Sequence, residues 1–238
     1  MRPGTFITII LVLCFVASYV IYEYMLPQFV KDGGPVVIIL MVLTMMDVTF
    51  IIERSLTMRK AKGKRPQVQF LKEAMDAIRK NDTGKAINLC SAQTGTMANV
   101  LRAGLERYQT ISGENLTSDR QVSEIRRSFD EANTLEMPLL ERNLIALQTI
   151  ATIATLVGLL GTTIGMIRAF AAMAQEGAPD ALQLALGISE ALINTAGGLA
   201  AAIMGIIAYN YFINKVDSVT YAVDEVTQEV VSVLTGRS

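Results

Sequence analysis

Long apolar stretches alternate with charged ones along this chain of 238 residues. Residues 144–167 contain no charged side chain, and residues 181–214 contain only Glu190. Each stretch is longer than the roughly 20 apolar residues that a helix needs to cross a bilayer. The pattern therefore predicts two membrane-spanning helices.

Two shorter apolar stretches come before them. Residues 36–52 are interrupted only by Asp47, and residues 5–22 are uncharged but follow Arg2. A short uncharged run behind a basic residue is also typical of a signal peptide. No clear small-x-small cleavage site precedes Glu23, so we favour a retained N-terminal helix. The prediction is an all-α membrane protein with three to four transmembrane helices, the last two extended into the cytoplasm.

Basic side chains crowd behind the second apolar stretch and predict the orientation of the chain. They are Arg54, Arg59, Lys60, Lys62, Lys64 and Arg65. Loops that stay in the cytoplasm retain Lys and Arg, whereas the connections 23–34 and 175–180 hold only Lys31. Asp47 lies about 10 Å from the inner surface by helix rise, and we expect it to reach the interface or these basic groups.

The predicted organisation follows from these stretches. It comprises an N-terminal apolar helix with an outer connection (1–34), a transmembrane helix (35–54), a cytoplasmic helical region (55–142), a transmembrane helix (143–174), an outer connection (175–180), a transmembrane helix (181–213) and a cytoplasmic amphipathic tail (214–238). From Thr117 the charged helical pattern runs into the third span, and we expect one long helix bent at Pro138.

The tail carries a valine stripe with alternating spacings of three and four, as in a helical seam. Its members are Val216, Val219, Val223, Val226, Val230 and Val233. The stripe must be buried against another helix. Two partners fit this requirement, namely the cytoplasmic helices of the same chain and neighbouring copies.

The composition excludes many classes of enzyme. The chain contains no His, so it cannot form a His-based catalytic triad or a His-ligated zinc site. Cys14 lies in an apolar stretch and Cys90 in the hydrophilic middle, so we expect neither a disulfide nor a metal site. The glycine-rich run 158–165 lacks the Lys of a phosphate loop. We therefore expect no enzyme activity, no cofactor and no nucleic-acid partner.

The two long apolar stretches each present one face of small or hydroxylated residues. On the third segment the face consists of Ala151, Thr155, Gly158, Thr162, Gly165, Ala169 and Ala172. On the fourth it consists of Gly187, Ala191, Asn194, Gly198, Ala201 and Gly205. Small residues let membrane helices approach closely. We expect such contacts to join copies of the chain, with helix packing at Gly158, Gly161, Gly165, Gly198, Ala201 and Gly205.

Glu190 is not explained by packing. Counted from the outer connection it lies about 15 Å deep, where a charged carboxylate costs roughly 2.5 kcal/mol or more. Thr162 and Thr195 lie at about 18 and 22 Å. Arg168 is counted at only about 9 Å, so we expect it to reach outward and leave Glu190 without a cation. This polar layer predicts an ion pathway formed by Thr155, Thr162, Glu190, Asn194 and Thr195.

Three motifs in these stretches resemble the MotA/TolQ/ExbB proton-channel family, most closely its ExbB/TolQ branch. They are Gly-Leu-Leu-Gly-Thr at 158–162 with Gly165 and Met166, Ile-Ser-Glu-Ala-Leu at 188–192 with Thr195 and Ala196, and Tyr-Asn-Tyr-Phe at 209–212. Glu53 and Arg54 also fit. The chain departs from the family at Thr155, where a Pro often stands, and at Ile164, where an aromatic residue is common.

The resemblance implies a homo-oligomeric ring, usually a pentamer, in the lipid of the bacterial inner membrane. It also implies a single-span partner similar to ExbD or TolR, whose membrane Asp accepts the ion, while residues matching Thr162, Thr195 and Glu190 line the site. Ion flow would turn the ring relative to the partner and drive a TonB-like protein. The implied function is a channel subunit that energises a periplasmic or outer-membrane process such as TonB-dependent import.

Several alternatives remain open at this point. A TolQ-like subunit for envelope maintenance and a flagellar-stator-like subunit share the same features. A passive membrane scaffold needs the small-residue faces but has no use for a buried Glu. A membrane enzyme needs reactive groups near the bilayer edge, where none cluster. The ion is a proton or sodium, since Asn194 and Thr163 add oxygens that a sodium site could use.

Overall fold

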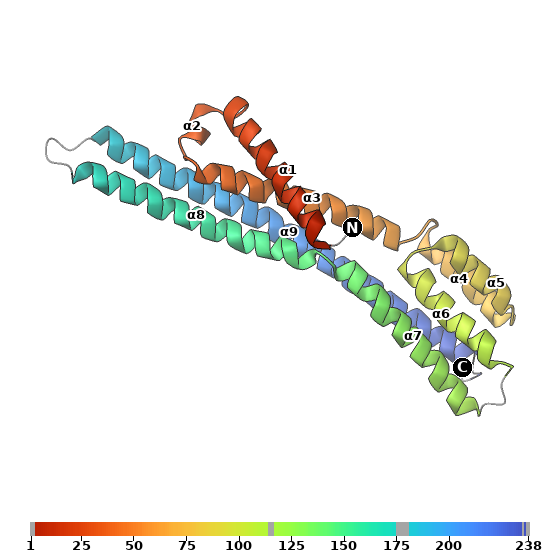
Figure 1. Cartoon of the computed structure of the whole chain (residues 1–238). Helices are drawn as coiled ribbons and strands as arrows, with labels where there is room; N and C mark the ends of the chain where they lie inside the picture. Colours follow the sequence, from red (N-terminus) through yellow and green to blue (C-terminus); the bar gives the residue numbers. More distant parts are fainter. Residues whose placement is uncertain (1–2, 114–116, 175–180, 235, 237–238) are drawn as a thin grey trace. The chain divides into compact units, whose positions relative to one another are not determined.

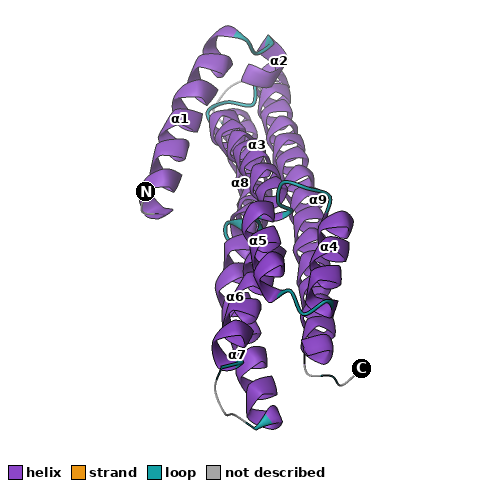
Figure 2. Cartoon of the chain, turned by 90° about the vertical axis from the view of Figure 1, so that its right-hand side faces the viewer, coloured by secondary structure: helices purple, strands orange, loops and turns teal. Residues whose placement is uncertain are grey.

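The computed structural model describes residues 3–113, 117–174, 181–234 and 236, and in these residues every regular element is a helix (Figures 1 and 2). The predicted connection 175–180 lies outside the described residues. The helices are α1 (Pro3–Tyr24), α2 (Gln28–Lys31), α3 (Val36–Ala61), α4 (Gln67–Arg79), α5 (Thr83–Gln93), α6 (Thr96–Ile111), α7 (Ser118–Glu141), α8 (Leu144–Met173) and α9 (Ala181–Leu234).

Three stretches are long and apolar enough to cross a membrane. They are Val36–Ala61, Ser118–Met173 and Ala181–Leu234. The apolar part of α1 for which side chains are described, Thr8–Tyr24, is shorter than these three. The predicted all-α membrane fold with at least three spans is therefore confirmed.

The chain divides into two compact units. Met1–Ile52 and Asn143–Tyr211 form the first, which we call the membrane unit. Glu53–Arg142 and Phe212–Ser238 form the second, which we call the bundle unit.

Within the membrane unit, α1 packs on α3 through one side of its helix. Ile10, Cys14 and Ser18 are buried at intervals of four residues, and the Ser18 hydroxyl donates to the sulfur of Met45 at 3.2 Å. Large apolar side chains such as Leu13 remain exposed on the other side of α1. An exposed apolar helix surface is what a lipid environment accepts without cost.

Helices α8 and α9 run antiparallel and in close contact (Figure 1), because glycines meet backbone along their shared face. A Cβ added to Gly158 would lie 3.0 Å from the Cα of Gly198. Near the other end, a Cβ on Gly165 would lie 2.7 Å from the carbonyl oxygen of Gly187. The small residues therefore allow the two backbones to touch, as such residues do in membrane helices.

The predicted long helix is interrupted, and the interruption lies beyond Pro138. Pro138 lies inside α7, whereas the helix ends at Glu141 and resumes at Leu144. Arg142 is extended (φ −52°, ψ 136°) and Asn143 has a positive φ of 64°. Asn tolerates this left-handed conformation better than most residues. The break therefore lies at Arg142 and Asn143, where the backbone leaves the helical conformation.

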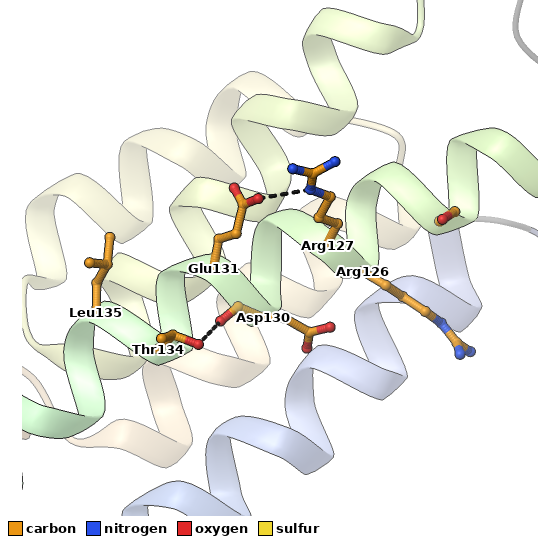
Figure 3. Close-up of a pocket in the computed structure, with 7 residues that line it drawn as sticks. Arg126, Arg127, Asp130, Glu131, Thr134 and Leu135 are labelled. Carbon is orange, nitrogen blue, oxygen red and sulfur yellow. Dashed lines mark hydrogen bonds and ion pairs between the residues drawn. The ribbon is translucent and has the colours of Figure 1, made fainter.

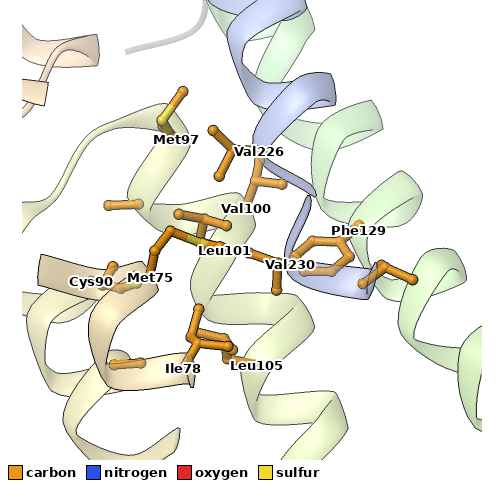
Figure 4. Packing of buried hydrophobic residues seen from close by; sticks show 14 of the residues in the cluster. Met75, Ile78, Cys90, Met97, Val100, Leu101, Leu105, Phe129, Val226 and Val230 are labelled. Atoms are coloured by element: carbon orange, nitrogen blue, oxygen red, sulfur yellow. The ribbon is translucent and has the colours of Figure 1, made fainter. Parts of the chain in front are cut away.

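The bundle unit has a hydrophobic core built from α4 to α7 and the end of α9 (Figure 4). Val223, Val226 and Val230 of the valine stripe are buried in this core, and Val219 and Val233 pack against it. The stripe thus contacts helices of its own chain, the first of the two predicted partners. Cys90 is buried in the same core, and burial raises the pKa of its thiol to about 12.

Arg54, at the start of the bundle unit, is buried, although the sequence predicted that it belongs to a basic cluster at the membrane surface. Its guanidinium is 2% exposed and donates to both carboxylate oxygens of Glu53 and, at 3.0 Å, to the carbonyl oxygen of Leu140. The other basic residues of the predicted cluster, from Arg59 to Arg65, are exposed. Only these five remain available to face lipid headgroups or solvent.

Candidate functional site

Two threonine hydroxyls meet between α8 and α9. Thr162 Oγ1 and Thr195 Oγ1 are 3.1 Å apart, and both residues are half-buried. Thr162 Oγ1 also lies 2.9 Å from the carbonyl oxygen of Leu159 and 3.2 Å from that of Gly158. A hydroxyl has one proton to donate and can accept from two sides. This pair can therefore hold or relay a proton between the two helices.

Glu190 is buried on α9 and forms an ion pair with Arg168 of α8. The expectation that Glu190 lacks a cation was wrong. Cα–Cβ bonds tilt toward the N-terminus of a helix. In this antiparallel pair, Arg168 therefore leans deeper along α8, while Glu190 leans the opposite way along α9. The long Arg side chain closes the remaining gap, so counting helix rise alone overestimated the separation.

The turn between α2 and α3 packs against this ion pair. Gly34 has a φ of 72°, which favours glycine, and a Cβ there would lie 2.7 Å from Glu190 Oε1. The same Cβ would be 3.7 Å from Arg168 Nη1. The sequence Gly33-Gly34 thus lets backbone approach a charged pair that a larger residue would disturb.

Asn194 is fully buried one helical turn after Glu190, and its side chain faces the same turn. Its Nδ2 donates to the carbonyl oxygen of Gly33 at 2.9 Å, and its Oδ1 has no hydrogen-bond partner in the described part of the chain. A Cβ on Gly161 would come within 2.4 Å of Asn194 Cβ. Asn194 therefore fixes the contact of α9 with α8 and the turn, and it does not join the threonine pair.

Thr155 stands apart from the other predicted pathway residues. It is exposed, and its hydroxyl donates to the carbonyl oxygen of Ala151 in its own helix at 3.1 Å. Thr163 is likewise exposed and bonds to Leu160. The predicted set thus separates into a threonine pair, an acid with its cation, a buried amide and a lone hydroxyl.

The small-residue faces are used inside one chain. Gly158, Gly161, Gly165 and Gly198 all lie at the α8–α9 contact. Ala201 is buried too, and a Cβ on Gly205 would meet Ala151 of α8 at 3.0 Å. We expected these faces to join copies of the chain. The glycines of both faces are therefore covered within the chain and are not available for contacts between copies.

Sequence reasoning missed the roles of two charged residues, Arg168 and Asp47. Asp47 was expected to reach the interface but is fully buried, with Gly205 as a close neighbour. The signal for Asp47 was its position as the sole charge of an apolar stretch. The signal for Arg168 was that no other basic residue lies next to the two long apolar stretches on the predicted outer side.

A hollow on the surface of α7 is a weaker candidate for a binding site (Figure 3). Its charged side chains are partly satisfied locally: Arg127 Nε donates to Glu131 Oε1 at 2.8 Å. The Thr134 hydroxyl donates to the backbone oxygen of Asp130 at 2.8 Å. All lining residues come from this one helix, so the hollow is the exposed face of a helix in which neighbouring charges pair.

Comparison with known proteins gives a consistent family. The model of the MotA/TolQ/ExbB proton channel family matches residues 92–225. An ExbB-like 3 biopolymer transport protein from Synechocystis is 31% identical over 182 residues, 76% of this chain and 81% of that protein.

Two further relatives match over shorter regions. The biopolymer transport protein ExbB of Helicobacter pylori is 41% identical over 91 residues, which cover 38% of this chain and 62% of that protein. The Tol-Pal system protein TolQ of Pseudomonas aeruginosa is 34% identical over 114 residues, 48% of this chain and 49% of that protein. The chain thus spans less than two thirds of these two relatives.

Proposed function

Because the chain belongs to the MotA/TolQ/ExbB proton channel family, we propose that it is the channel-forming subunit of a proton-driven membrane motor. It is a multi-pass membrane protein with three helices suited to span the bilayer. The family consists of channel and transport subunits and is not a class of enzymes, and we assign no catalytic residue.

The observation that carries this proposal is the contact between Thr162 and Thr195 at 3.1 Å. Packing does not require two hydroxyls to face each other across a membrane helix pair, since alanine would fit with less polarity. A half-buried hydroxyl pair can accept a proton on one side and donate one on the other. We assign the pair as the proton relay of the subunit.

Glu190 and Arg168 form a charged group one to two turns along α9 from Thr195. Arg168 compensates the charge of Glu190, which lowers the cost of keeping a carboxylate in the membrane. A carboxylate that approaches from another polypeptide would compete with Glu190 for Arg168. In this proposal the ion pair is the element that senses the charge of a partner.

We assign the mobile ion acceptor to a single-span partner similar to ExbD or TolR, through its membrane Asp. Glu190 is already paired with Arg168, which supports an acceptor outside this chain. The subunits would surround the partner as a homo-oligomeric ring, a pentamer in this proposal. Ring contacts would use the exposed faces of α8 and α9, because the small-residue faces are covered.

The proposed location is the bacterial inner membrane, with the bundle unit in the cytoplasm. The motor would energise a periplasmic or outer-membrane process such as TonB-dependent import, acting through a TonB-like protein. A TolQ-like role in the cell envelope is the second candidate, which the similarity to the Pseudomonas aeruginosa TolQ supports.

The test combines partner binding with proton-driven work on the same variants. Glu190→Gln keeps size but removes ionisation, and Thr162→Val keeps shape but removes the hydroxyl. Both are expected to co-purify with the single-span partner in normal amount while proton-driven work is lost. Thr152→Val is the matched control, since Thr152 is exposed on α8 and bonds only to the carbonyl of Gln148 in its own helix.

The outcomes separate function from packing. Normal work in both variants would exclude this site from proton transfer. Loss of partner binding in both would reduce Glu190 and Thr162 to packing residues. A loss of work in Thr152→Val as large as in Thr162→Val would show a general effect of removing a membrane hydroxyl.

A further inference from the structure

Asp47 is a buried carboxyl group that the proposed relay does not use. It lies in α3 between apolar neighbours, is 0% exposed, and belongs to the membrane unit. Neither of its carboxylate oxygens has a hydrogen-bond partner among the described residues. A buried polar group without a partner costs free energy, and a charged one costs more. Asp47 therefore needs an explanation other than packing.

The space around this carboxyl group is provided by α8 and α9. A Cβ added to Gly205 of α9 would lie 3.1 Å from Asp47 Oδ2. It would also lie 3.0 Å from the Cβ of Ala151 and 3.2 Å from the carbonyl oxygen of Leu147, both on α8. A glycine and an alanine thus leave room for a carboxyl group where three helices meet.

Among the residues that the structure describes, no cation forms an ion pair with Asp47. Residues 144–167 of α8, 191–214 of α9 and 5–22 of α1 contain no Asp, Glu, Lys or Arg. The other titratable groups in these ranges are Cys14, which is buried on α1, Tyr209, one turn after Gly205, and three further tyrosines, of which Tyr19 and Tyr211 are exposed and Tyr22 is half-buried. On α3 itself the next charges are Glu53 and Arg54, which bind each other.

An ionised aspartate at this position would have neither a hydrogen-bond donor nor a cation as a partner in the described part of the chain. At the centre of a membrane helix it costs at least about 2.5 kcal/mol. A protonated carboxyl group avoids the charge and gains a hydroxyl that can donate a hydrogen bond. Among the described aspartates Asp47 alone is buried, since the other seven are exposed.

We propose that Asp47 is a second proton-binding site of this chain, separate from Glu190 and the threonine pair. It holds a proton in the conformation seen here and releases it to water when the contact between α3, α8 and α9 loosens. Gly205 follows Glu190 by about 22 Å of helix rise along α9, so Asp47 serves the opposite half of the membrane unit. This role in transport rests on the proposed function, whereas the proton binding itself does not.

A proton fits this site better than a metal ion. Hard cations such as sodium or calcium require several oxygen ligands around one point. In the part of the chain that the structure describes, no three His, Cys, Asp or Glu side chains gather. One carboxyl group in an apolar pocket can bind a proton without any further ligand.

Infrared spectroscopy of the full chain in lipid, with its partner, tests the proton directly. A carboxylic-acid band is expected at neutral pH. It should shift when aspartate carries carbon-13 in its carboxyl group, and again after transfer to heavy water. The band should disappear in Asp47→Asn and persist in Asp32→Asn, the matched control on the exposed side of the unit.

The outcomes decide each part of the proposal. Absence of the aspartate band in the unmutated complex would overturn it, even if Asp47→Asn fails to fold. A band that never shifts in heavy water would overturn release of the proton. If Glu190→Gln and Thr162→Val abolish proton-driven work but Asp47→Asn keeps it, Asp47 has no part in transport and the proposed function stands. Loss of work in a folded Asp47→Asn that still binds the partner is the expected result.

Discussion

At the scale of single residues, the ion pair between Arg168 and Glu190 compensates the charge of a carboxylate that is buried in the membrane unit. The Arg168 side chain is 54% exposed and that of Glu190 is 9% exposed. Removal of the cation leaves a buried carboxylate alone, whereas removal of the acid leaves an arginine that can reach the surface. The two single substitutions are therefore not equivalent.

We expect Arg168→Gln to destabilise the membrane unit more than Glu190→Gln. The double variant should be more stable than the sum of the single effects predicts, with a coupling free energy on the order of 1 kcal/mol. Unfolding of the four proteins of this cycle in one detergent measures the coupling. Additive effects would mean that the pair contributes nothing to stability.

The residues proposed for the site stand out in the sequence, but their pairing does not. Thr162, Thr195 and Glu190 stand out because polar groups in apolar stretches are costly. Helix rise placed them at similar depth, and the threonines do meet. The contact of Arg168 with Glu190 depends on side-chain lean and length. The burial of Asp47 depends on which side of α3 faces Gly205. Counting residues along the helices predicts neither the contact of Arg168 with Glu190 nor the burial of Asp47.

At the scale of elements, the contact of α6 with α7 depends on a glycine. A Cβ on Gly104 would lie 2.2 Å from atoms of the Phe129 ring. This distance is well below van der Waals contact, so the ring or the helix would have to move. Gly84 of α5 offers a contrast because a Cβ there would meet nothing within 4 Å.

We expect Gly104→Ala to destabilise the bundle unit by about 1–3 kcal/mol, the usual cost of overpacking. Gly84→Ala should leave stability unchanged or raise it by up to about 1 kcal/mol. Amide hydrogen exchange of α6 and α7 in the full chain reports both effects. If Gly104→Ala costs as much in a Phe129→Leu background, the clash with the ring is not the cause.

The same two helices are linked by Arg107 and Glu124, which form an ion pair. The hydrogen bond from Arg107, and then its charge, lower the pKa of Glu124 from the usual 4.5. A lowered folded-state pKa stabilises the folded form above the unfolded value, and this contribution disappears as pH falls through the folded value. The pair therefore makes the α6–α7 contact weaker in acid.

We expect the stability of the bundle unit to fall as pH drops below about 4.5, and to fall less steeply in Arg107→Gln. Thermal unfolding across this pH range compares the two proteins. Both residues are partly exposed, so the difference should be small. An identical pH dependence would show that the pair does not shift this titration in the folded protein.

The spacing of apolar residues predicted the elements well where one face of a helix is buried. The valine stripe required a helical partner, and the core of the bundle unit supplies one. The break at Arg142 and Asn143 escaped prediction because neither residue is a strong breaker and Pro138 offered a more obvious one. A left-handed Asn is visible only in the backbone angles.

At the scale of the whole molecule, the exposed basic residues behind α3 are expected to set the orientation. Anionic lipid attracts each Lys or Arg near the surface by about 1 kcal/mol. Replacing Arg59, Lys60, Lys62 and Lys64 with Gln should therefore produce mixed topology, which reporter fusions on either side of the membrane measure. The matched control replaces four exposed basic residues that are farther along the chain from the apolar stretches 36–52, 144–167 and 181–214, namely Lys72, Lys80, Lys85 and Arg120. Equal disturbance in both variants would point to total charge instead of position.

The backbone contacts between α8 and α9 also restrict how this subunit can move. A screw motion of one residue, a rise of about 1.5 Å with a rotation of about 100°, would bring Leu159 or Leu199 to the places where Gly158 now meets Gly198. Such a shift cannot occur while the helices stay in contact, because a leucine does not fit where two backbones touch. Helices α8 and α9 therefore keep one register and are expected to move together as one rigid unit. Any rotation or gating must take place at its outer surfaces, against α3, lipid, a neighbouring copy or a partner helix.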